Sequence, residues 1–347
     1  METILITGGS GFFGELLVKS LLERGYHCVN IDLEDDPNHH PNIVSIKGDI
    51  RDEETLRSIF DRFKFSAIVH LAAILAHAVK DKSFLWTSNV DGTRNIAHFA
   101  KQYGVKKVIF TSSNCLWGEP FGRPVREDDP PNPVELYGRS KWEGEKILSE
   151  AASDGSFQAV IFRCPTIIDC GRLGLLSILF EFIDEGRKVW VVGGGENVYQ
   201  FIYAGDLIEA CVKALTFNGT DVFNIGSDNV ESFRSVYADV IAKTGTRARV
   251  ANFPRMLAIP AMKLAYALKL SPLGPYQYKM IAESFVFDTT KIKQKLQWSP
   301  TLNNAQMLWK AYEYYHTHRH EIENRQNVSA HKQAAKMGII RLLKWLS

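Results

Sequence analysis

Short apolar runs alternate with amphipathic stretches along the first half of this chain. Runs of four to six residues, lying at 4–7, 27–32, 43–47, 67–71, 107–111 and 158–162, are typical of strands buried on both faces. Between them, apolar residues recur every three or four positions, as in helices expected at 14–24 and 89–103. The alternation predicts an α/β fold in which helices cover both faces of a parallel sheet.

The composition narrows the classes of function. A net charge of +2 over 347 residues gives no sign of nucleic-acid binding. The five cysteines lack metal-ligand spacing and the pattern of a secreted disulfide framework, so we expect no metal site and a reducing compartment. The start passes directly into the first strand, and no run reaches the ~18 apolar residues of a membrane span. We therefore expect neither a signal peptide nor a transmembrane helix.

The first turn carries candidate chemistry. Residues 7–14, Thr-Gly-Gly-Ser-Gly-Phe-Phe-Gly, join the first expected strand to a helix. Such a turn lets a dinucleotide pyrophosphate approach the helix N-terminus, with Gly8 at the tight turn, Gly11 at the close approach and Gly14 at the helix–strand packing. Asp32 ends the second strand, where a carboxylate accepts hydrogen bonds from ribose hydroxyls and repels a 2′-phosphate. Since no arginine adjoins it, NAD is favoured over NADP.

Tyr137 and Lys141 are four positions apart in an expected helix, so the phenol and the ammonium share one face. A neighbouring cation, together with a positive nicotinamide ring, lowers the pKa of a phenol toward the range that proton transfer needs. The glycine turn and this pair together indicate hydride transfer.

With these motifs in this order, the chain resembles the extended short-chain dehydrogenase/reductase superfamily, in particular its epimerase/dehydratase and hydroxysteroid-dehydrogenase-like branches. The resemblance runs from about residue 4 to about residue 315. It implies a Rossmann doubly wound sheet over 1–165 and a smaller substrate lobe over 166–320, with some segments returning to the sheet. It also implies an NAD site formed by Gly8, Gly11, Phe12, Phe13, Gly14, Asp32, Asp49, Ile50, Leu71, Ala72, Ala73, Asn89, Tyr137, Lys141 and Pro165.

Ser113 completes the implied catalytic group. In the resembling families, the hydroxyl four positions before an aromatic–glycine pair, here Trp117 and Gly118, hydrogen-bonds the substrate oxygen. Trp117 replaces the usual tyrosine, which we expect to change the shape of the pocket. Sugar dehydratases carry an acidic pair directly after this hydroxyl. Asn114 and Cys115 stand there in this chain and cannot do that proton work, so dehydration is not expected.

The substrate half departs from the usual nucleotide clamp. Many nucleotide-sugar epimerases place arginine and aspartate where this chain has Tyr199 and Gln200. A phenol cannot replace the forked hydrogen bonding of arginine. The local pattern is similar to hydroxysteroid-dehydrogenase relatives and to epimerases of lipid-diphosphate-linked sugars. Arg172 and Arg187 are candidate phosphate ligands, although solvated surface charge is the favoured interpretation of each.

Two segments are candidates for contact with a lipid surface. Residues 256–270 are rich in Leu, Ala, Ile and Met, and a core or lobe-packing helix broken at Pro260 is favoured over a membrane-facing one. The tail, 332–347, has the composition of an interfacial helix, and equally of a helix that docks on the protein itself or on a second subunit. Its apolar face comprises Ala335, Ile339, Leu342, Leu343 and Leu346, with Arg341 and Lys344 opposite.

These features predict an NAD-dependent epimerase of a sugar attached to a diphosphate carrier, either a nucleotide or a polyprenyl lipid, acting through a keto intermediate. The rival prediction is an NAD-dependent dehydrogenase of a sterol-like or other hydrophobic alcohol. A non-catalytic NAD sensor is disfavoured because Ser113, Tyr137 and Lys141 are all present. We expect a cytoplasmic protein with a linker and tail helix at 321–347. The sequence leaves open both a peripheral contact of the tail helix with the inner face of the membrane and a homodimer.

Overall fold

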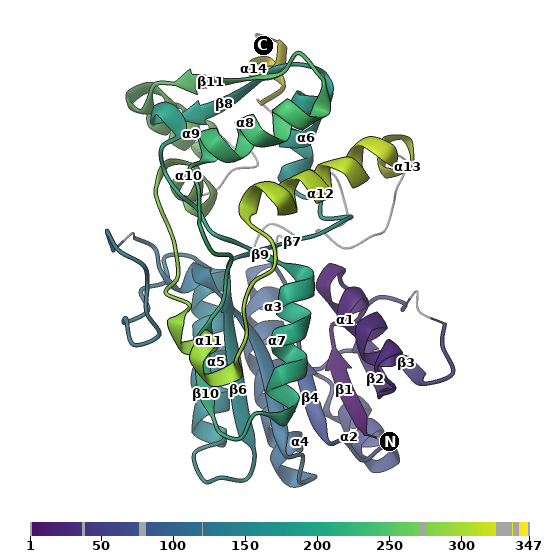
Figure 1. The fold of residues 1–347 in the computed structure, drawn as a ribbon. Helices are drawn as coiled ribbons and strands as arrows, with labels where there is room; N and C mark the ends of the chain where they lie inside the picture. The colour runs from purple at the N-terminus through teal and green to yellow at the C-terminus, as the bar shows by residue number, and fades with distance from the viewer. Residues whose placement is uncertain are drawn as a thin grey trace.

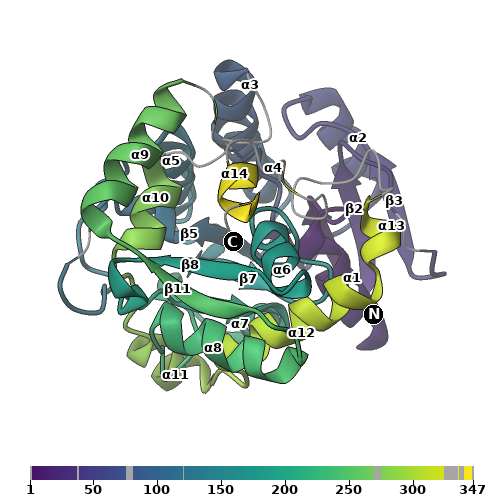
Figure 2. The ribbon, with the colours of Figure 1, turned by 90° about the horizontal axis from the view of Figure 1, so that it is seen from above.

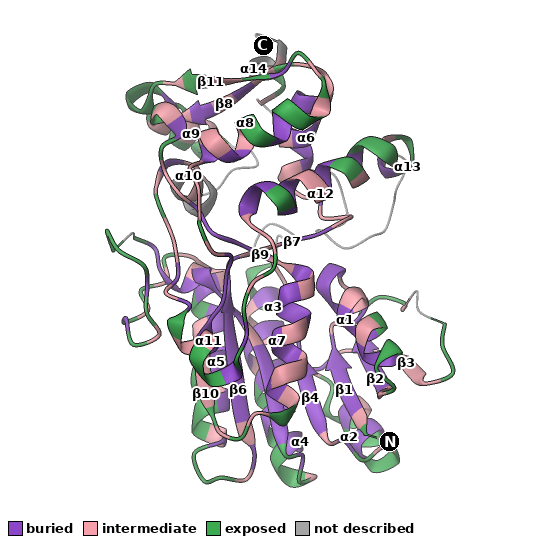
Figure 3. Ribbon diagram, viewed as in Figure 1, coloured by how far each residue is buried: buried purple, intermediate pink, exposed green. Residues whose placement is uncertain are grey.

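The computed structural model describes residues 2–36, 39–75, 81–119, 121–268, 270, 275–323, 335 and 340–345. A seven-stranded parallel sheet, in the order β10-β6-β5-β4-β1-β2-β3, forms the centre of the molecule (Figure 1). Its strands are β1 (Thr3–Thr7), β2 (His27–Asp32), β3 (Ile43–Lys47), β4 (Ala67–His70), β5 (Lys107–Ser113), β6 (Gln158–Cys164) and β10 (Asp221–Asn224). Figure 3 shows these strands, apart from the edge strand β3, as the most buried layer, which explains their near-continuous apolar runs.

Helices cover both faces of this sheet, each face with its own apolar core. One core holds side chains of α1 (Phe12–Glu23), α7 (Ala204–Thr216) and α11 (Thr290–Leu296). The other holds side chains of α2 (Glu53–Arg62), α4 (Gly92–Gln102) and α5 (Leu136–Ala151). The short helix α3 (Lys82–Trp86) and the π-helix η1 (Thr87–Asp91) lead into α4. The predicted α/β Rossmann-type fold is confirmed.

A smaller lobe lies over the end of the sheet at which the strands finish (Figures 1 and 2). Two short parallel pairs build it, β7 (Thr166–Ile168) with β9 (Phe201–Tyr203) and β8 (Lys188–Val192) with β11 (Arg249–Phe253). Around a third core pack α6 (Leu176–Asp184), α8 (Phe233–Thr244) and α12 (Asn304–Thr317). The remaining lobe elements are η3 (Gly193–Gly195), α9 (Arg255–Ala267), α10 (Pro275–Ala282), α13 (Arg319–Glu323) and α14 (Ile340–Trp345).

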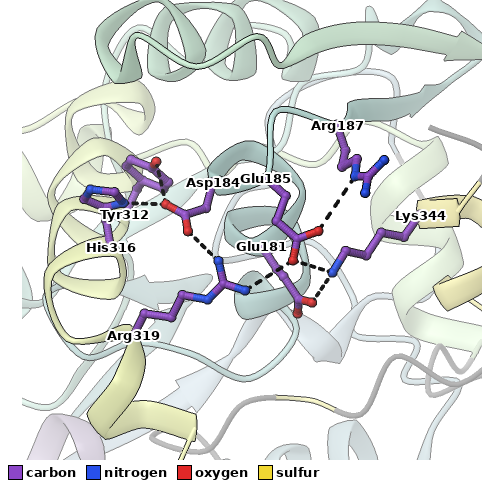
Figure 4. A network of polar contacts seen from close by, with 8 residues as sticks. All are labelled: Glu181, Asp184, Glu185, Arg187, Tyr312, His316, Arg319 and Lys344. Carbon is purple, nitrogen blue, oxygen red and sulfur yellow. Dashed lines mark hydrogen bonds and ion pairs between the residues drawn. The ribbon is translucent and has the colours of Figure 1, made fainter.

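The described part of the tail contacts α6 of the lobe. Lys344 of α14 pairs with Glu181 and with Glu185, the latter at 2.6 Å, and Arg319 donates to Asp184 at 2.6 Å (Figure 4). Ala335 and Ile340 pack against the lobe core. These contacts match the docking alternative for the tail, while Ile339 and Leu346 lie outside the described residues. Membrane binding through the tail stays a prediction, and no described helix is long and apolar enough to span a bilayer.

Helix α9 differs from its sequence prediction. It runs unbroken through Pro260, and Ala258 is its only residue that is fully buried. A proline inside a helix leaves the carbonyl four residues earlier without its N–H partner. That carbonyl belongs to Met256, whose surroundings are open to water, so solvent can satisfy it. Of the favoured interpretation of 256–270, the break at Pro260 and a position in the core are therefore wrong, whereas a helix that packs on the lobe by one face agrees with the buried Ala258.

A buried ion pair ties α5 to the sheet. Arg163 of β6 donates to Glu145 of α5 through Nε at 3.1 Å and Nη2 at 2.8 Å, and the two side chains are 4% and 2% exposed. Nη1 of Arg163 also donates to the carbonyl of Glu127 at 2.8 Å, and its guanidinium lies 5.1 Å from the ring of Trp117. These contacts compensate the desolvation of both charges and set the position of α5 on β6.

We predict that Glu145→Gln destabilises the protein by about 3–5 kcal/mol, because it leaves the Arg163 charge buried without its carboxylate. Urea unfolding followed by circular dichroism measures the change. The matched control is Asp154→Asn, which breaks an ion pair with Lys101 whose side chains are 52% and 48% exposed, where the expected loss is about 0–1 kcal/mol. Equal losses in the two variants would contradict the structural role of the buried pair.

Candidate active site

The glycine turn between β1 and α1 is shaped by close backbone approaches. Gly8 has φ +78°, and a Cβ there would lie 2.7 Å from the backbone nitrogen of Ala72. A Cβ on Gly14 would lie 2.2 Å from the carbonyl oxygen of Gly8, so only glycine lets α1 pack this close to the turn. Gly11 is the N-cap of α1 and places no side chain over the helix N-terminus, which suits the binding of a pyrophosphate.

Asp32 lies beside this turn and is held by it. Its carboxylate accepts hydrogen bonds from the backbone N–H of Ser10 at 2.9 Å and of Glu34 at 3.1 Å. Burial raises its pKa, and those two hydrogen bonds oppose the rise. Asn30, on β2, accepts from the N–H of Gly9 at 2.9 Å and so fixes the other side of the turn. The sequence analysis missed Asn30, although a buried polar residue inside an apolar strand is a signal that could have found it.

The other predicted cofactor residues lie around the same edge of the sheet. Phe12, Phe13, Ile50 and Pro165 are buried, and Leu71, Ala72 and Ala73 directly follow β4. The side chain of Asp49 pairs with Arg51 at 2.5 Å, so its charge is already compensated within the protein. Asn89 accepts from the N–H of Ile74 at 2.7 Å and donates to Ser140 at 3.0 Å. It thus joins the segment after β4 to the helix that carries the tyrosine, and direct contact of Asn89 or Asp49 with NAD stays a prediction.

A second close packing brings the tyrosine helix to the end of β5. Gly138 follows Tyr137, and a Cβ there would lie 2.2 Å from the carbonyl oxygen of Cys115. Cys115 belongs to the 3-10 turn η2 (Asn114–Leu116), which Ser113 caps by accepting its N–H at 3.1 Å. The first turn of α5, which carries Tyr137, therefore packs against the turn that Ser113 caps.

Lys141 is a buried cation aimed into this site. Its side chain is 2% exposed, its Nζ lies 4.0 Å from the centre of the Phe110 ring, and burial lowers its pKa to about 7. Among the described residues, none accepts a hydrogen bond from this nitrogen. A buried ammonium group with no protein acceptor fits a site for the hydroxyls of a bound dinucleotide ribose.

The electrostatics of Tyr137 differ from the prediction. Burial raises the pKa of the phenol, and the thiols of Cys115 and Cys164 raise it further. Lys141 is not among the groups that shift the pKa of Tyr137, and its ammonium lies 4.0 Å from the centre of the Phe110 ring. The lowering by Lys141 together with a bound nicotinamide ring stays a prediction. The group that lowers the pKa of Tyr137 is instead Arg172.

Arg172 is the cation that the sequence analysis undervalued. Its guanidinium carbon lies 5.7 Å from the centre of the Phe12 ring, and burial lowers its pKa to about 10. Its Nε is buried and has no hydrogen-bond partner among the described residues. The interpretation of Arg172 as solvated surface charge is therefore wrong. For Arg187 the same interpretation holds, since its side chain is 44% exposed and stands 3.7 Å from Glu185.

The residues in place of the nucleotide clamp are structural. Tyr199 is buried and its hydroxyl accepts from Asn114 at 2.5 Å. Gln200 accepts from the N–H of Phe287 at 2.8 Å and donates to the carbonyl of Ser227 at 2.7 Å. Both side chains are thus committed to the packing of the lobe. Trp117 likewise packs in a small core with Val125 and Phe287, where it supports the Arg163 guanidinium.

Comparisons with known proteins agree with this geometry. The sequence profile of the NAD dependent epimerase/dehydratase family matches residues 4–226. The uncharacterized protein y4nG of Sinorhizobium fredii is 35% identical over 99% of this chain and 86% of its own length. The N-acetyl-alpha-D-glucosaminyl-diphospho-ditrans,octacis-undecaprenol 4-epimerase of Escherichia coli O157:H7 is 28% identical, covering 84% of this chain and 85% of that protein.

Among solved structures, the UDP-glucose 4-epimerase of Thermotoga maritima with UDP-glucose superposes with a TM-score of 0.75. It is 25% identical in sequence, and the match covers 91% of this chain and 99% of that one. The profile covers more than half of the present chain, including the glycine turn, Ser113, Tyr137 and Lys141. The chain therefore belongs to the NAD dependent epimerase/dehydratase family and is an NAD-dependent enzyme of the extended short-chain dehydrogenase type.

Proposed function

We propose that this protein is an NAD-dependent epimerase of a sugar attached to a diphosphate carrier. The observation that carries the proposal is the meeting of Tyr137, a group for proton transfer, with Arg172, a cation whose Nε has no hydrogen-bond partner among the described residues. A diphosphate supplies the anion that such an arginine binds, whereas a sterol-like alcohol has none. A buried arginine without a hydrogen-bond partner among the described residues thus favours an anionic substrate.

Residues of the protein carry out the proton transfer of this proposed reaction. Tyr137 takes the proton of the sugar hydroxyl as its carbon is oxidised and returns one after the ring has turned, while Ser113 hydrogen-bonds the same oxygen. NAD, when bound, supplies a reversible acceptor for the hydride, so the reaction consumes no net oxidant. Lys141 would hold the cofactor ribose, which accounts for an ammonium buried without a protein acceptor.

The relatives support a diphosphate link without selecting the carrier. The name of the Escherichia coli relative specifies a sugar on undecaprenyl diphosphate, and the Thermotoga maritima structure holds UDP-glucose. Both substrates present a diphosphate beside the sugar. The carrier stays open between a nucleotide and a polyprenyl lipid. The cytoplasmic location and a second subunit stay predictions.

Dehydration remains disfavoured by the site. Elimination of water requires an acid and a base next to the substrate. Asn114, directly after Ser113, is buried and donates to Tyr199, and Cys115 carries no carboxylate. The rival that one observation favours is the dehydrogenase of a hydrophobic alcohol, because Tyr199 and Gln200 leave no arginine fork at the usual clamp position.

The deciding measurement is product formation without added cofactor. We expect the purified protein to interconvert epimers of a UDP- or polyprenyl-diphosphate-linked sugar with no net NADH, monitored by NMR together with absorbance at the NADH band. Tyr137→Phe should lower the rate about 10²- to 10⁴-fold, since only the phenolic hydroxyl is lost, and should keep NAD affinity. Stoichiometric NADH release from a sterol or other hydrophobic alcohol would establish the rival.

Arg172→Leu should raise the KM for the diphosphate-linked sugar about 10- to 100-fold, because it removes hydrogen bonds to a charged group. NAD affinity, measured by fluorescence titration, should change little. The control is Arg187→Leu, which removes an exposed arginine and should alter neither quantity. If Arg172→Leu weakens NAD and leaves the KM unchanged, the arginine serves the cofactor and the argument from the substrate diphosphate fails.

Lys141→Met should stabilise the protein while weakening NAD binding. The pKa of Lys141 is lowered to about 7 from 10.5, so the cost of burying the charge is full below about pH 7 and is relieved as the pH rises toward 10.5. The gain at pH 7 should be on the order of a few kcal/mol, at about 1.4 kcal/mol per pKa unit.

Urea unfolding across pH 6 to 10 measures this effect, and the variant should lose the rise in stability above pH 7. Lys146→Met, on the same helix with a side chain 49% exposed, is the control and should change little. A destabilised Lys141→Met variant would show that the ammonium is a structural group.

A further inference from the structure

Apolar side chains gather on the solvent side of α9. Of nine large apolar side chains exposed among the described residues, six lie on this helix or just after it. They are Met256, Leu257, Leu264, Tyr266, Leu268 and Leu270, with Met256 88% exposed. An exposed apolar patch of this kind marks an interaction site on a folded protein.

Helix α9 differs from an ordinary surface helix, which exposes polar side chains, because its solvent side carries large apolar residues. Ala258, Met262 and Ala265 face the lobe and are buried or half-buried. The opposite side carries the large apolar residues, and the exposed charged residues within α9 are Arg255 and Lys263. Because both faces are apolar, α9 is suited to lie between the lobe and a second apolar phase.

The charged residues beside α9 indicate which kind of apolar phase this helix would contact. Residues 254–282, 29 in all, contain Arg255, Lys263, Lys269 and Lys279 and no aspartate or glutamate. Arg255 donates to the carbonyl of Ala282 at 3.0 Å, which joins α9 to the end of α10. Glu283 follows directly and pairs with Arg255 at 3.6 Å, so the excess of basic charge on this segment comes from its lysines. An apolar surface with an excess of lysines beside it complements an anionic lipid leaflet.

A groove runs along the same helix. It lies against α9 and α10, has a volume of about 490 Å³, and is lined largely by apolar side chains such as Met256, Ile259 and Pro260. Arg255, Lys263 and Glu283 also line it, and Arg255 pairs with Glu283. A groove with apolar walls and Lys263 at its side accommodates an acyl chain whose phosphate remains near the lysine.

The patch adjoins the catalytic helix. Tyr278 of α10 lies close enough to Tyr266 and Glu135 for their charges to act on it. Glu135 is the N-cap of α5 and precedes Tyr137 by two residues. Figure 2 shows α9 and α10 side by side at the margin of the lobe. A surface bound by α9 would therefore lie near the end of α5 at which the tyrosine stands.

We propose that the exposed face of α9, Met256 to Leu270, lies in the interface of an anionic lipid bilayer and attaches the substrate lobe to it. The contact is distinct from the tail, since the described part of the tail docks on α6 through Lys344. It does not depend on the sugar chemistry, because lipid binding is measured without substrate.

The test is flotation of the full chain with vesicles of phosphatidylcholine containing phosphatidylglycerol. We expect binding that weakens with salt and with a falling share of the anionic lipid. Leu264→Glu should reduce the partition coefficient about tenfold or more, since it replaces an apolar contact with a charge. The matched control, Gln102→Glu, adds the same charge at an exposed position of α4 and should bind like the unchanged chain.

Three outcomes would overturn the proposal. One is equal vesicle binding by Leu264→Glu and the control. Another is loss of binding in a chain ending near Asn327 while Leu264→Glu binds normally, which would assign the contact to the tail. The third is a dimer in light scattering that Leu264→Glu dissociates, without vesicle binding by the unchanged chain, which would make the α9 face a contact between two copies. Circular dichroism of each variant establishes that the fold is retained.

Discussion

The ion pair between Arg163 and Glu145 is the constraint on which the site depends. Two charges buried between β6 and α5 can be stable only with their hydrogen bonds complete, so the pair leaves α5 one position on the sheet. Tyr137 and Lys141 belong to this helix, and Lys141 lies one turn before Glu145. The same helix thus carries a charge that is compensated within the protein and another that is not. The compensated charge of Glu145 fixes the position of the helix, and the uncompensated charge of Lys141 is available to a ligand.

Local patterns were sufficient for much of the fold. The strands at 27–32 and 43–47 agree with the structure at both ends, because apolar runs bounded by polar turns define them. The glycine turn and the Tyr137–Lys141 spacing also carry their information within a few residues. Strand β10 was not predicted. Helix α9 was expected to be a core or lobe-packing helix broken at Pro260, because composition alone does not show how much of the helix meets the lobe.

The parts of the site that the sequence analysis missed depend on contacts between distant segments. Arg172 is separated from Phe12 by 160 positions in the chain, and only the fold brings its guanidinium to the Phe12 ring beside the glycine turn. The pKa of Tyr137 likewise depends on Cys164 of a neighbouring strand and on Arg172, neither of which lies on its own helix. The spacing of Tyr137 and Lys141 shows that their side chains share a face, but it cannot show that Lys141 turns toward Phe110.

Strand β10 has a consequence for how the protein acquires its shape. The central sheet is complete only when residues 221–224 pair with β6, yet β7, α6, β8 and β9 of the lobe lie between these two strands in the chain. The lobe in turn is complete only with α12, which follows β10 and α11. The sheet therefore cannot be completed until the first part of the lobe has been synthesised, and the lobe cannot be completed until α12 follows the last strand of the sheet. Long-range pairing of this kind makes assembly slow and leaves a truncated chain with exposed apolar strands.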